Sequence, residues 1–305
     1  MNNTELELLK IIADMEGTPD GAYNIRSNGA LAERKVTPNI NITNKTDVQG
    51  IDITVRAGTK GETMHIPVII SETGHSETVY NDFIIGDDCD IVIMAGCGIH
   101  NCGDGESRHD GVHTFFVGKN SKVQYIERHY GDGDGIGGRV MNPTTVIHLA
   151  EGAYLEMETT QIKGIDSTNR ITNASLADDS TLVIREKLMT HGEQVATTDF
   201  TVDLNGVNSS ANVISRSVAK DKSYQEFKSR INGNNMCSGH TECDAIIMDD
   251  AKVCAIPEIT ANHIDASLIH EAAIGKIAGE QLIKLMTLGL TEQEAEEEIV
   301  NGFLK

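Results

Sequence analysis

Soft and borderline metal ligands gather in the last quarter of the chain. Cys237, His240 and Cys243 lie within seven residues in the pattern Cys-x-x-His-x-x-Cys, and His270 and Glu271 follow as a neighbouring pair. A spacing of three residues lets side chains of one loop or turn reach the same metal ion. Thiolate suits iron and sulfide because soft ligands favour that chemistry. The pattern therefore indicates a metal site suited to iron, and a buried thiol beside a salt-bridged glutamate is the structural alternative.

Glu271 has a position of its own in this group. We expect it to begin or precede a helix that carries Ile274. A carboxylate near a helix N-terminus stays ionised because the free N–H groups and the helix dipole favour the anion. An oxygen ligand beside thiolates would make a bound iron–sulfur cluster labile, which suits a protein that must release it.

A second group of possible ligands lies in the middle of the chain. Cys97, Cys102, His109 and His113 follow the spacing Cys-x4-Cys-x6-His-x3-His, whose central spacer is too short for a zinc finger. If β coils stack here, the segment with His129 lies close to Cys97. One interpretation is a metal-dependent enzyme that binds zinc through Cys97, His109 and His113. The other is a surface loop with incidental histidines.

The same segment offers cysteines for sulfur transfer. Residues 101–109 are polar and rich in glycine, so we expect an exposed loop. An exposed cysteine accepts sulfur from a persulfide when a nearby histidine, or Arg108, stabilises its thiolate. Cys97 and Cys102 are therefore candidates for sulfur transfer.

The segment Gly131–Gly138 matches a dinucleotide-binding fingerprint only formally. No helix is expected after it, its aspartates would repel phosphate, and the chain has no Gly-Lys-Ser/Thr of a nucleotide-binding P-loop. We interpret the segment as a flexible turn.

Composition excludes several classes of function. The chain has 305 residues and a formal net charge of −21, which disfavours nucleic acid as a partner. It has no apolar run long enough to cross a membrane and no basic export signal at its N-terminus, so we expect a cytoplasmic protein. Its six cysteines are then expected to be reduced thiols available for metal or sulfur chemistry.

A recurring turn predicts the architecture. The pattern of an apolar residue, a small residue and a polar pair that ends in Asp, Asn or Gly recurs at Asp88, Asn120, Gly152 and Asp179, every 27 to 32 residues. Met248-Asp-Asp250 is a shorter variant. Between these turns lie short runs of Val, Ile and Thr. Stacked coils produce such a repeat, so we predict a mainly β protein with a right-handed β-helix or β-solenoid core rather than a sandwich.

Helical patterns lie at both ends. A helix is expected over 4–15, with Thr4 and Glu7 as its capping box, and two more after residue 262, where Thr291 and Glu294 form another box. Gly289 and Gly302 are expected to end the last two helices. The predicted organisation is an N-terminal helix and lead-in over 1–35, a β-helix core over 36–262 and a C-terminal helical subdomain over 263–305.

Four short segments in the last quarter carry a family resemblance. They resemble the core of the SufB/SufD family, the scaffold components of the SUF system for iron–sulfur cluster assembly, over about residues 240–303. The segments are His240-Thr-Glu-Cys243-Asp244, Ile256-Pro257-Glu258-Ile259, His270-Glu271-Ala272-Ala273-Ile274-Gly275 and Gly302-Phe303.

The resemblance implies roles for particular residues. Cys243, in Glu-Cys-Asp, matches the scaffold cysteine of the family, and Glu271, in His-Glu-Ala, matches its partner glutamate. His270 is then a further ligand or a proton partner, whereas Cys237 and His240 are not fixed by the family motif. The family also has a sulfur-accepting cysteine in its β-helix, for which Cys97 and Cys102 remain the candidates.

The chain has no cysteine before Cys89, so it is similar to the short, minimal SufB-like forms rather than to the larger ones. Such a form is expected to act as a homodimer that carries a transient iron–sulfur cluster. The resemblance implies a SufC-type ABC ATPase docked on the C-terminal helices, and a cysteine desulfurase or other sulfur donor. The chain itself is then not an enzyme, because ATP hydrolysis belongs to the partner.

Three alternatives stay open at this point. The chain could be a SufD-like accessory without its own cluster, although the presence of both Cys243 and Glu271 argues against that. It could be the zinc-dependent enzyme on a β-solenoid described above. It could also be a purely structural β-helix adaptor that binds no metal.

Overall fold

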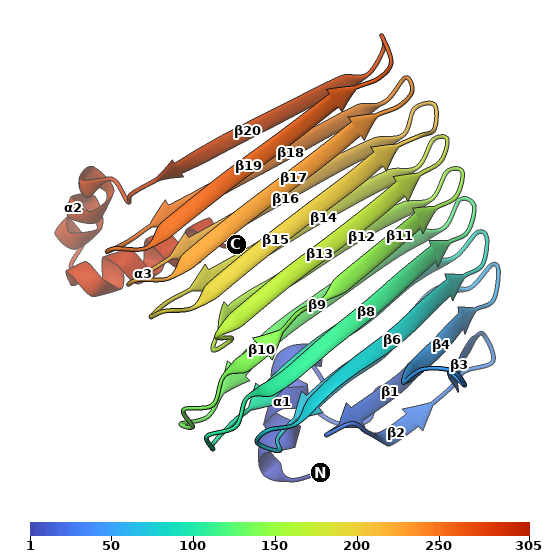
Figure 1. Cartoon of the computed structure of the whole chain (residues 1–305), viewed down its shortest axis with the longest axis horizontal. Helices are drawn as coiled ribbons and strands as arrows, with labels where there is room; N and C mark the ends of the chain where they lie inside the picture. The colour runs from blue at the N-terminus through green and yellow to red at the C-terminus, as the bar shows by residue number, and fades with distance from the viewer.

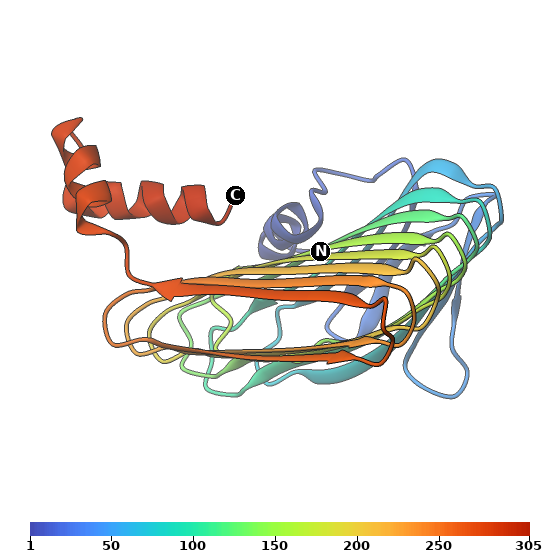
Figure 2. The same cartoon turned by 90° about the horizontal axis from the view of Figure 1, so that it is seen from above.

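The computed structural model describes all of residues 1–305. The chain winds into a β-solenoid of about 8 turns, which confirms the predicted class of fold. Two facing sheets of ten strands each run along the stack (Figures 1 and 2). Coils lie on one another almost entirely through parallel pairing, and only β1–β2 and β3–β4 at the N-terminal end are antiparallel.

The strands follow one another in a simple order. The first sheet contains β2 (Ala30–Lys35), β1 (Ala22–Ser27), β5 (Lys60–Ile70), β7 (Asp90–His100), β9 (Lys122–Asp132), β12 (Tyr154–Lys163), β14 (Thr181–Thr190), β16 (Ser210–Ala219), β18 (Ser238–Ile247) and β20 (Ser267–Gly275). The second contains β19 (Lys252–Ala261), β17 (Tyr224–Gly233), β15 (Val195–Leu204), β13 (Ser167–Leu176), β10 (Arg139–Met141), β8 (Ser107–Val117), β6 (Ser76–Ile85), β4 (Gly50–Val55) and β3 (Ile40–Asn44), with β11 (Thr144–Leu149) between β8 and β13.

The strands form because polar and apolar residues alternate with the period of two that a pleated strand requires. In β15, for example, Phe200, Val202 and Leu204 point inward and the residues between them outward. Adjacent coils pair in register, so inward side chains stack into one core of 36 buried residues. A single coil could not close this core alone, and stability therefore comes from its neighbours.

The predicted turn repeat is confirmed at one end of the coils. Asp88, Asn120, Gly152 and Asp179 all have positive φ angles, between 53° and 69°. Only Gly, Asn and Asp adopt this left-handed conformation readily, which explains why these residue types recur. Each turn also hydrogen-bonds the next: the N–H of Asp88 donates to the carbonyl of Lys119 at 2.8 Å.

The variant at Met248-Asp-Asp250 belongs to a different stack of turns. It joins β18 to β19 at the opposite edge of the solenoid, where Asp249 has the positive φ and the N–H of Asp250 donates to the carbonyl of Asp221 at 2.9 Å. Turns of this kind recur at both edges, here with Gly192, Asp221 and Asp249 at positive φ, because every coil reverses twice.

The N-terminal helix, α1 (Asn3–Ala13), begins earlier than predicted. Its capping box uses Asn2 and Glu5 instead of Thr4 and Glu7, because the Asn2 side chain accepts the N–H of Glu5 and the Glu5 carboxylate accepts the N–H of Asn2. The lead-in that we predicted over 1–35 also contains β1 and β2, so strands of the first sheet begin at Ala22.

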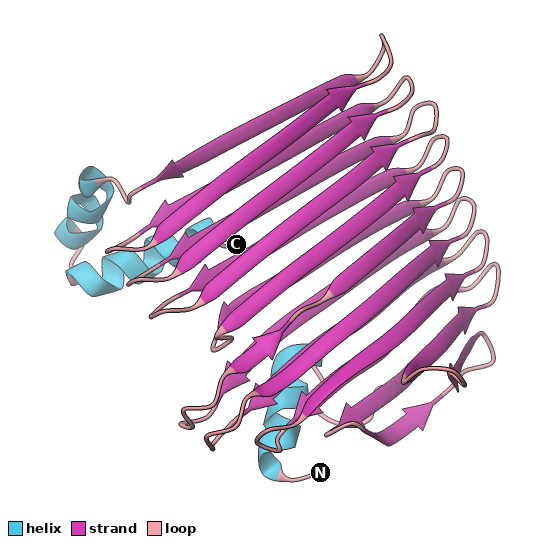
Figure 3. Ribbon diagram, in the orientation of Figure 1, coloured by secondary structure: helices cyan, strands magenta, loops and turns pink.

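The C-terminal region differs from its prediction more than the N-terminal helix does. Residues 267–275, which we expected to be helical, form β20, because inward and outward positions alternate there and pair in register with β18. Helices α2 (Gly279–Thr287) and α3 (Glu292–Phe303) follow, and the Thr291–Glu294 capping box is confirmed (Figure 3). Gly302 lies inside α3 rather than after it.

Both terminal helices lie against the outer face of the first sheet (Figure 2). In α1, Leu8 and Ile12 rest on Gly98 and Gly96 of β7, where a side chain would collide with them. In α3, Val300 packs on Val218 of β16, and Leu304 follows beside it. None of the three helices combines the length and apolarity that a membrane-spanning helix requires.

Candidate functional site

The C-terminal ligand residues lie on β18 and β20, the last two strands of the first sheet. Parallel pairing places Thr241 beside His270, Glu242 beside Glu271 and Cys243 beside Ala272. Directly paired residues of neighbouring strands point to the same side of a sheet. Cys243 and His270 therefore face the interior of the solenoid, whereas Glu271 faces outward.

The pattern Cys-x-x-His-x-x-Cys is drawn out along a strand and does not fold into a turn. Cys237 and Cys243 both point into the core, but six residues of extended chain separate them by about 20 Å. His240 is three residues from each, an odd offset that places it on the outer face. The expectation that these three residues share one ion in a turn is therefore not met. Cys237 instead packs beside Ala266 and Leu268.

The inner face offers a thiol and an imidazole. Burial raises the pKa of Cys243 to about 12, with a smaller contribution from the charges of Glu186 and Asp244, so the thiol is protonated at neutral pH. His270 Nδ1 lies 3.0 Å from Thr241 Oγ1, and its Nε2 is buried without a hydrogen-bond partner. Burial also lowers the pKa of His270, which leaves the ring neutral and its Nε2 free to bind a metal.

The outer face offers an imidazole and two carboxylates. The ligand atoms of His240, Glu242 and Glu271 all lie within 4.8 Å of one another. His240 Nδ1 lies 3.1 Å from Asn212 Oδ1, which orients its Nε2 toward Glu271 at 3.7 Å. Partial burial raises the pKa of Glu242, as do its hydrogen bond with Asp244 and the repulsion between the two carboxylates. A cation bound by His240, Glu242 and Glu271 would counter that repulsion by neutralising the charge of Glu242.

Glu242 was not among the predicted ligands. Its signal in the sequence is the His-x-Glu spacing of residues 240 and 242, because alternate residues of a strand share one face. Nitrogen and oxygen ligands of this type suit ferrous iron as well as other divalent ions.

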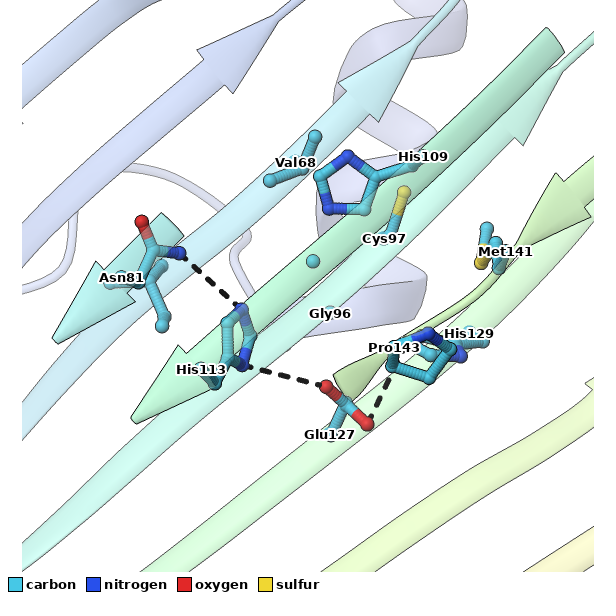
Figure 4. A pocket seen from close by; sticks show the side chains of 12 residues that line it. Val68, Asn81, Gly96, Cys97, His109, His113, Glu127, His129, Met141 and Pro143 are labelled. Atoms are coloured by element: carbon cyan, nitrogen blue, oxygen red, sulfur yellow. Dashed lines mark hydrogen bonds and ion pairs between the residues drawn. The ribbon is translucent and has the colours of Figure 1, made fainter. Parts of the chain in front are cut away.

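The second predicted group encloses a small interior cavity of about 20 Å³, room for one water molecule (Figure 4). Cys97 faces it from β7, His109 and His113 from β8, and His129 from β9, where it pairs with Cys97 as the stacking of coils predicts. The cavity exists because Gly111 has no side chain: a Cβ there would lie 3.3 Å from His109 Nε2 and 3.2 Å from His113 Nε2.

Two buried carboxylates dominate the electrostatics of this interior. Burial alone would raise the pKa of Glu77, but its bonds to His109 at 3.1 Å and Arg26 at 2.9 Å outweigh burial and lower the pKa to about 2. Glu127 accepts a hydrogen bond from Arg170 at 2.7 Å, and its pKa likewise falls well below the usual range.

The pKa shifts of His113 and Cys97 favour the neutral forms of these side chains, whereas those of Glu77 and Glu127 favour the charged forms. Burial lowers the pKa of His113 to about 4, so its ring is uncharged at neutral pH. Burial raises the pKa of Cys97 well above its usual value, and the nearby Glu77 and Glu127 add to the effect. Cys97 is thus an inert, protonated thiol inside the wall. Only His240, Glu242 and Glu271 form a compact three-ligand group in the structure, so the zinc alternative has no preformed site at Cys97.

We expect stability to fall in acid in two steps. His113 is neutral in the folded protein down to about pH 4, but protonates near pH 6.5 when unfolded, so its stabilisation is lost as the pH falls between these values. Glu77 acts in the same direction between about pH 4.5 and pH 2. Each step contributes up to about 3 kcal/mol. Urea unfolding at pH 7.5, 5 and 3.5 measures the first step and the start of the second, and a flat profile would contradict it.

Cys102 lies apart from the cavity, exposed on the loop after β7. Its Sγ is 2.9 Å from His100 Nε2, and His100 Nδ1 is 2.7 Å from Asp132 Oδ1. The sequence predicted Cys102 but neither of these partners. Asp132 comes from the next coil, 32 residues on, where β9 pairs it with His100.

The segment Gly131–Gly138 is not a flexible turn as we predicted. Its backbone stacks on the loop of residues 101–105, and a Cβ on Gly133 or Gly137 would lie 2.2 Å or 2.1 Å from a carbonyl oxygen of that loop. The glycines therefore serve close contact between coils, and they surround no phosphate site.

Fold and site together define a class: a β-solenoid protein with candidate metal ligands on both faces of its last coil. The family model "SUF system FeS cluster assembly, SufBD core domain" matches residues 69–303, and the chain belongs to this SufBD family.

The names of curated relatives agree with this family assignment. The chain is 32% identical over 243 residues to the iron–sulfur cluster assembly SufBD family protein MJ0034 of Methanocaldococcus jannaschii, which covers 79% of this chain and 76% of that protein. It is 28% identical over 260 residues to a SufBD family protein of Archaeoglobus fulgidus, 85% of this chain and 69% of the relative. It is also 33% identical to the iron–sulfur cluster assembly protein SufB of Bacillus subtilis, over 32% of this chain and 22% of that one. Membership of the family supports a role in SUF iron–sulfur cluster assembly.

Proposed function

We propose that this chain is a scaffold on which the SUF system builds iron–sulfur clusters, with iron and sulfide as its cargo. The observation that carries the proposal is the arrangement on β18 and β20. These two strands present Cys243 and His270 on the inner face and His240, Glu242 and Glu271 on the outer face of one sheet edge. A soft thiol for sulfide-bridged iron and harder ligands for incoming ferrous iron are thus only one sheet thickness apart.

Assembly of a cluster requires ligands from the inner and the outer face of this sheet edge to reach the same iron. β20 is the terminal strand of the first sheet, so its outer edge has no neighbouring strand to hold it. His270 and Glu271 are successive residues of this strand and point to opposite sides. A local twist of the edge strand at Glu271 would turn its carboxylate toward the face that carries Cys243 and His270. The Cys243 thiol must lose its proton when it binds iron, so loading becomes easier as the pH rises.

Partners supply what the chain lacks. We assign ATP hydrolysis to a SufC-type ATPase, because no nucleotide-binding loop occurs in the sequence. Ile283, Met286 and Leu288 are exposed apolar side chains on and after α2, which suits the docking of that partner. A second copy of the chain at the open end of the solenoid would complete a homodimer, and movement of the ATPase would open it to release the cluster. A cysteine desulfurase is the expected sulfur donor.

Replacement of Glu271 tests the outer ligand group. In Glu271→Ala, purified without oxygen together with the candidate ATPase, we expect iron per protomer to fall by about half or more, because one of three converging ligands is lost. Glu258→Ala is the matched control, since Glu258 is also an exposed glutamate near the C-terminal end but pairs with Arg230 at 2.6 Å. Iron, acid-labile sulfide and zinc are measured together. Zinc alone, unchanged in both variants, would exclude the scaffold and favour the zinc enzyme.

A further inference from the structure

Two buried histidines of β8 border one small space inside the solenoid. His109, Gly111 and His113 alternate along the strand, so all three face the interior. A Cβ built on Gly111 would lie 3.3 Å from His109 Nε2 and 3.2 Å from His113 Nε2. Because Gly111 has no side chain, the two ring nitrogens share the cavity that its Cβ would fill (Figure 4).

Hydrogen bonds orient both rings so that Nε2 can act as an acceptor. His109 Nδ1 lies 3.1 Å from Glu77 Oε1, and an ionised carboxylate can only accept, so Nδ1 carries a proton. Tyr125 Oη donates to Glu127 at 2.9 Å and therefore accepts from His113 Nδ1, also at 2.9 Å. A carboxylate behind an imidazole is the arrangement that orients the histidine ligands of metal ions. Here one carboxylate acts directly and the other through a hydroxyl group.

A third acceptor beside the cavity has no hydrogen-bond partner. Asn81 is 5% exposed and pairs with His113 across β6 and β8. Its Oδ1 is buried without a hydrogen bond, while its Nδ2 lies 3.3 Å from His113 Nε2. A half-turn of the amide exchanges these two atoms and directs the oxygen toward the ring nitrogen and the cavity. An unsatisfied amide oxygen in the interior costs free energy, and a cation in the cavity would remove that cost.

The interior around the cavity has more carboxylates than guanidinium groups. The buried carboxylates are Glu77, Glu127 and Glu186, and the buried guanidinium groups are Arg26 and Arg170. Arg26 pairs with Glu77 at 2.9 Å and Arg170 with Glu127 at 2.7 Å. Glu186 shares Arg170 at 3.8 Å and has no cation of its own. Buried charge needs counter-charge nearby, and a cation in the cavity would supply it beside Glu127, which lines the same space.

We propose that this cavity binds one divalent cation of borderline softness, of the zinc type, through His109 Nε2, His113 Nε2 and Asn81 Oδ1. Two imidazoles with one oxygen suit such an ion, whereas magnesium and calcium take oxygen ligands. Metal–nitrogen bonds of about 2.1 Å require each ring nitrogen to move about 1 Å toward the point that they share. Cys97 stays outside the ligand set, because burial raises the pKa of its thiol well above the usual value.

This site is separate from the candidate ligands of the last coil, and its chemistry is structural. β9 and β18 are four strand spacings apart in the first sheet, about 20 Å. The cavity of about 20 Å³ holds an ion but leaves no room for a substrate. A catalytic zinc keeps an open position, whereas a structural zinc is closed by its ligands. The bound ion would join β6 to β8 and so stabilise two neighbouring coils of the solenoid.

Zinc content, measured with the outer ligand group removed, tests the site. The full-length variant His240→Ala/Glu271→Ala is freed of metal with a chelator, incubated with Zn²⁺ and desalted. Addition of Gly111→Ala to this variant should lower the zinc content by about one ion per chain. The new methyl group takes the place of the ion, while every proposed ligand is still present. The same comparison with Mg²⁺ should show no difference. Equal zinc contents would overturn the proposal and leave the cavity to water.

Two further variants separate loss of the ion from damage to the fold. His109→Gln removes one ligand nitrogen, but its amide can still donate to Glu77, and it should lose the same single zinc. His148→Ala is the matched control, because His148 is an exposed histidine of the adjacent strand β11 that stacks on Phe116. It should keep the zinc. A variant of His109 that retains all of its zinc would overturn the proposal, as would equal losses in His109→Gln and His148→Ala.

Thermal unfolding gives a readout that does not depend on any activity. Excess Zn²⁺ should raise the unfolding temperature of the chain that has Gly111 and leave that of Gly111→Ala unchanged, because an ion stabilises only the folded state that binds it. An equal rise in both would overturn the proposal. The scaffold function fails or stands separately, since Gly111→Ala leaves Cys243 and its neighbours intact and should load iron and sulfide as the wild type does.

Discussion

Cys243→Ser should lose nearly all acid-labile sulfide and most of the iron that co-purifies with the wild-type protein. Cys243 is the thiol that β18 places on the same inner face of the last coil as His270, and a serine hydroxyl is a poor ligand for sulfide-bridged iron. Folding should change little, because serine is slightly smaller than cysteine and the position already pairs with a serine, Ser215 of β16. Iron and sulfide per protomer, measured after anaerobic purification with the ATPase, check the result.

Cys254→Ser is the matched control, since Cys254 also lies in the last coil but on β19 and partly exposed. It should retain wild-type iron and sulfide. If both variants load equally, Cys243 is a packing residue and the proposal for the inner ligand group is wrong. A loss in both variants, together with a lower unfolding temperature, would point to general damage to the last coil.

The sequence predicted the solenoid because its turns require particular types of residue. Left-handed positions accept few residue types, so Asp88, Asn120 and Asp179 recur at the spacing of one coil. The strand β20 has no comparable marker residues in its sequence. Ile274 and Ile277 fit a helical stripe by spacing, and the competing alternation of Leu268, His270 and Ala272 became decisive only once β18 was there to pair with it.

The site was predicted in its residue types but not in its geometry. A spacing of three residues joins ligands in a turn or on a helix, whereas in a strand it sends His240 to the face opposite Cys243. Partners from neighbouring coils were missed for a related reason. Glu242 meets Glu271, and His100 meets Asp132, only through strand register, which a single sequence does not display.

Removal of a buried charge should have a second large effect, this time on the stability of the solenoid. Arg170→Ala should lower the free energy of unfolding by about 3–5 kcal/mol, the cost of leaving buried charges without their partner. Arg170 is buried on β13 and donates to Glu127 at 2.7 Å, with Glu186 at 3.8 Å on its other side. Without the guanidinium, two carboxylates would remain in a dry interior. Urea unfolding at pH 7.5 measures the change.

Arg185→Ala separates burial from charge, because Arg185 also pairs with a glutamate, Glu156 at 3.2 Å, but its side chain is 44% exposed. An exposed pair contributes about 1 kcal/mol or less. The deficit of Arg170→Ala should also shrink as the pH falls toward 5, since an unpaired buried carboxylate takes up a proton more easily than an exposed one. Equal, small losses in both variants at every pH would mean that water reaches Glu127. The interior around Glu127 and Glu186 would then be hydrated rather than a dry site closed by buried ion pairs.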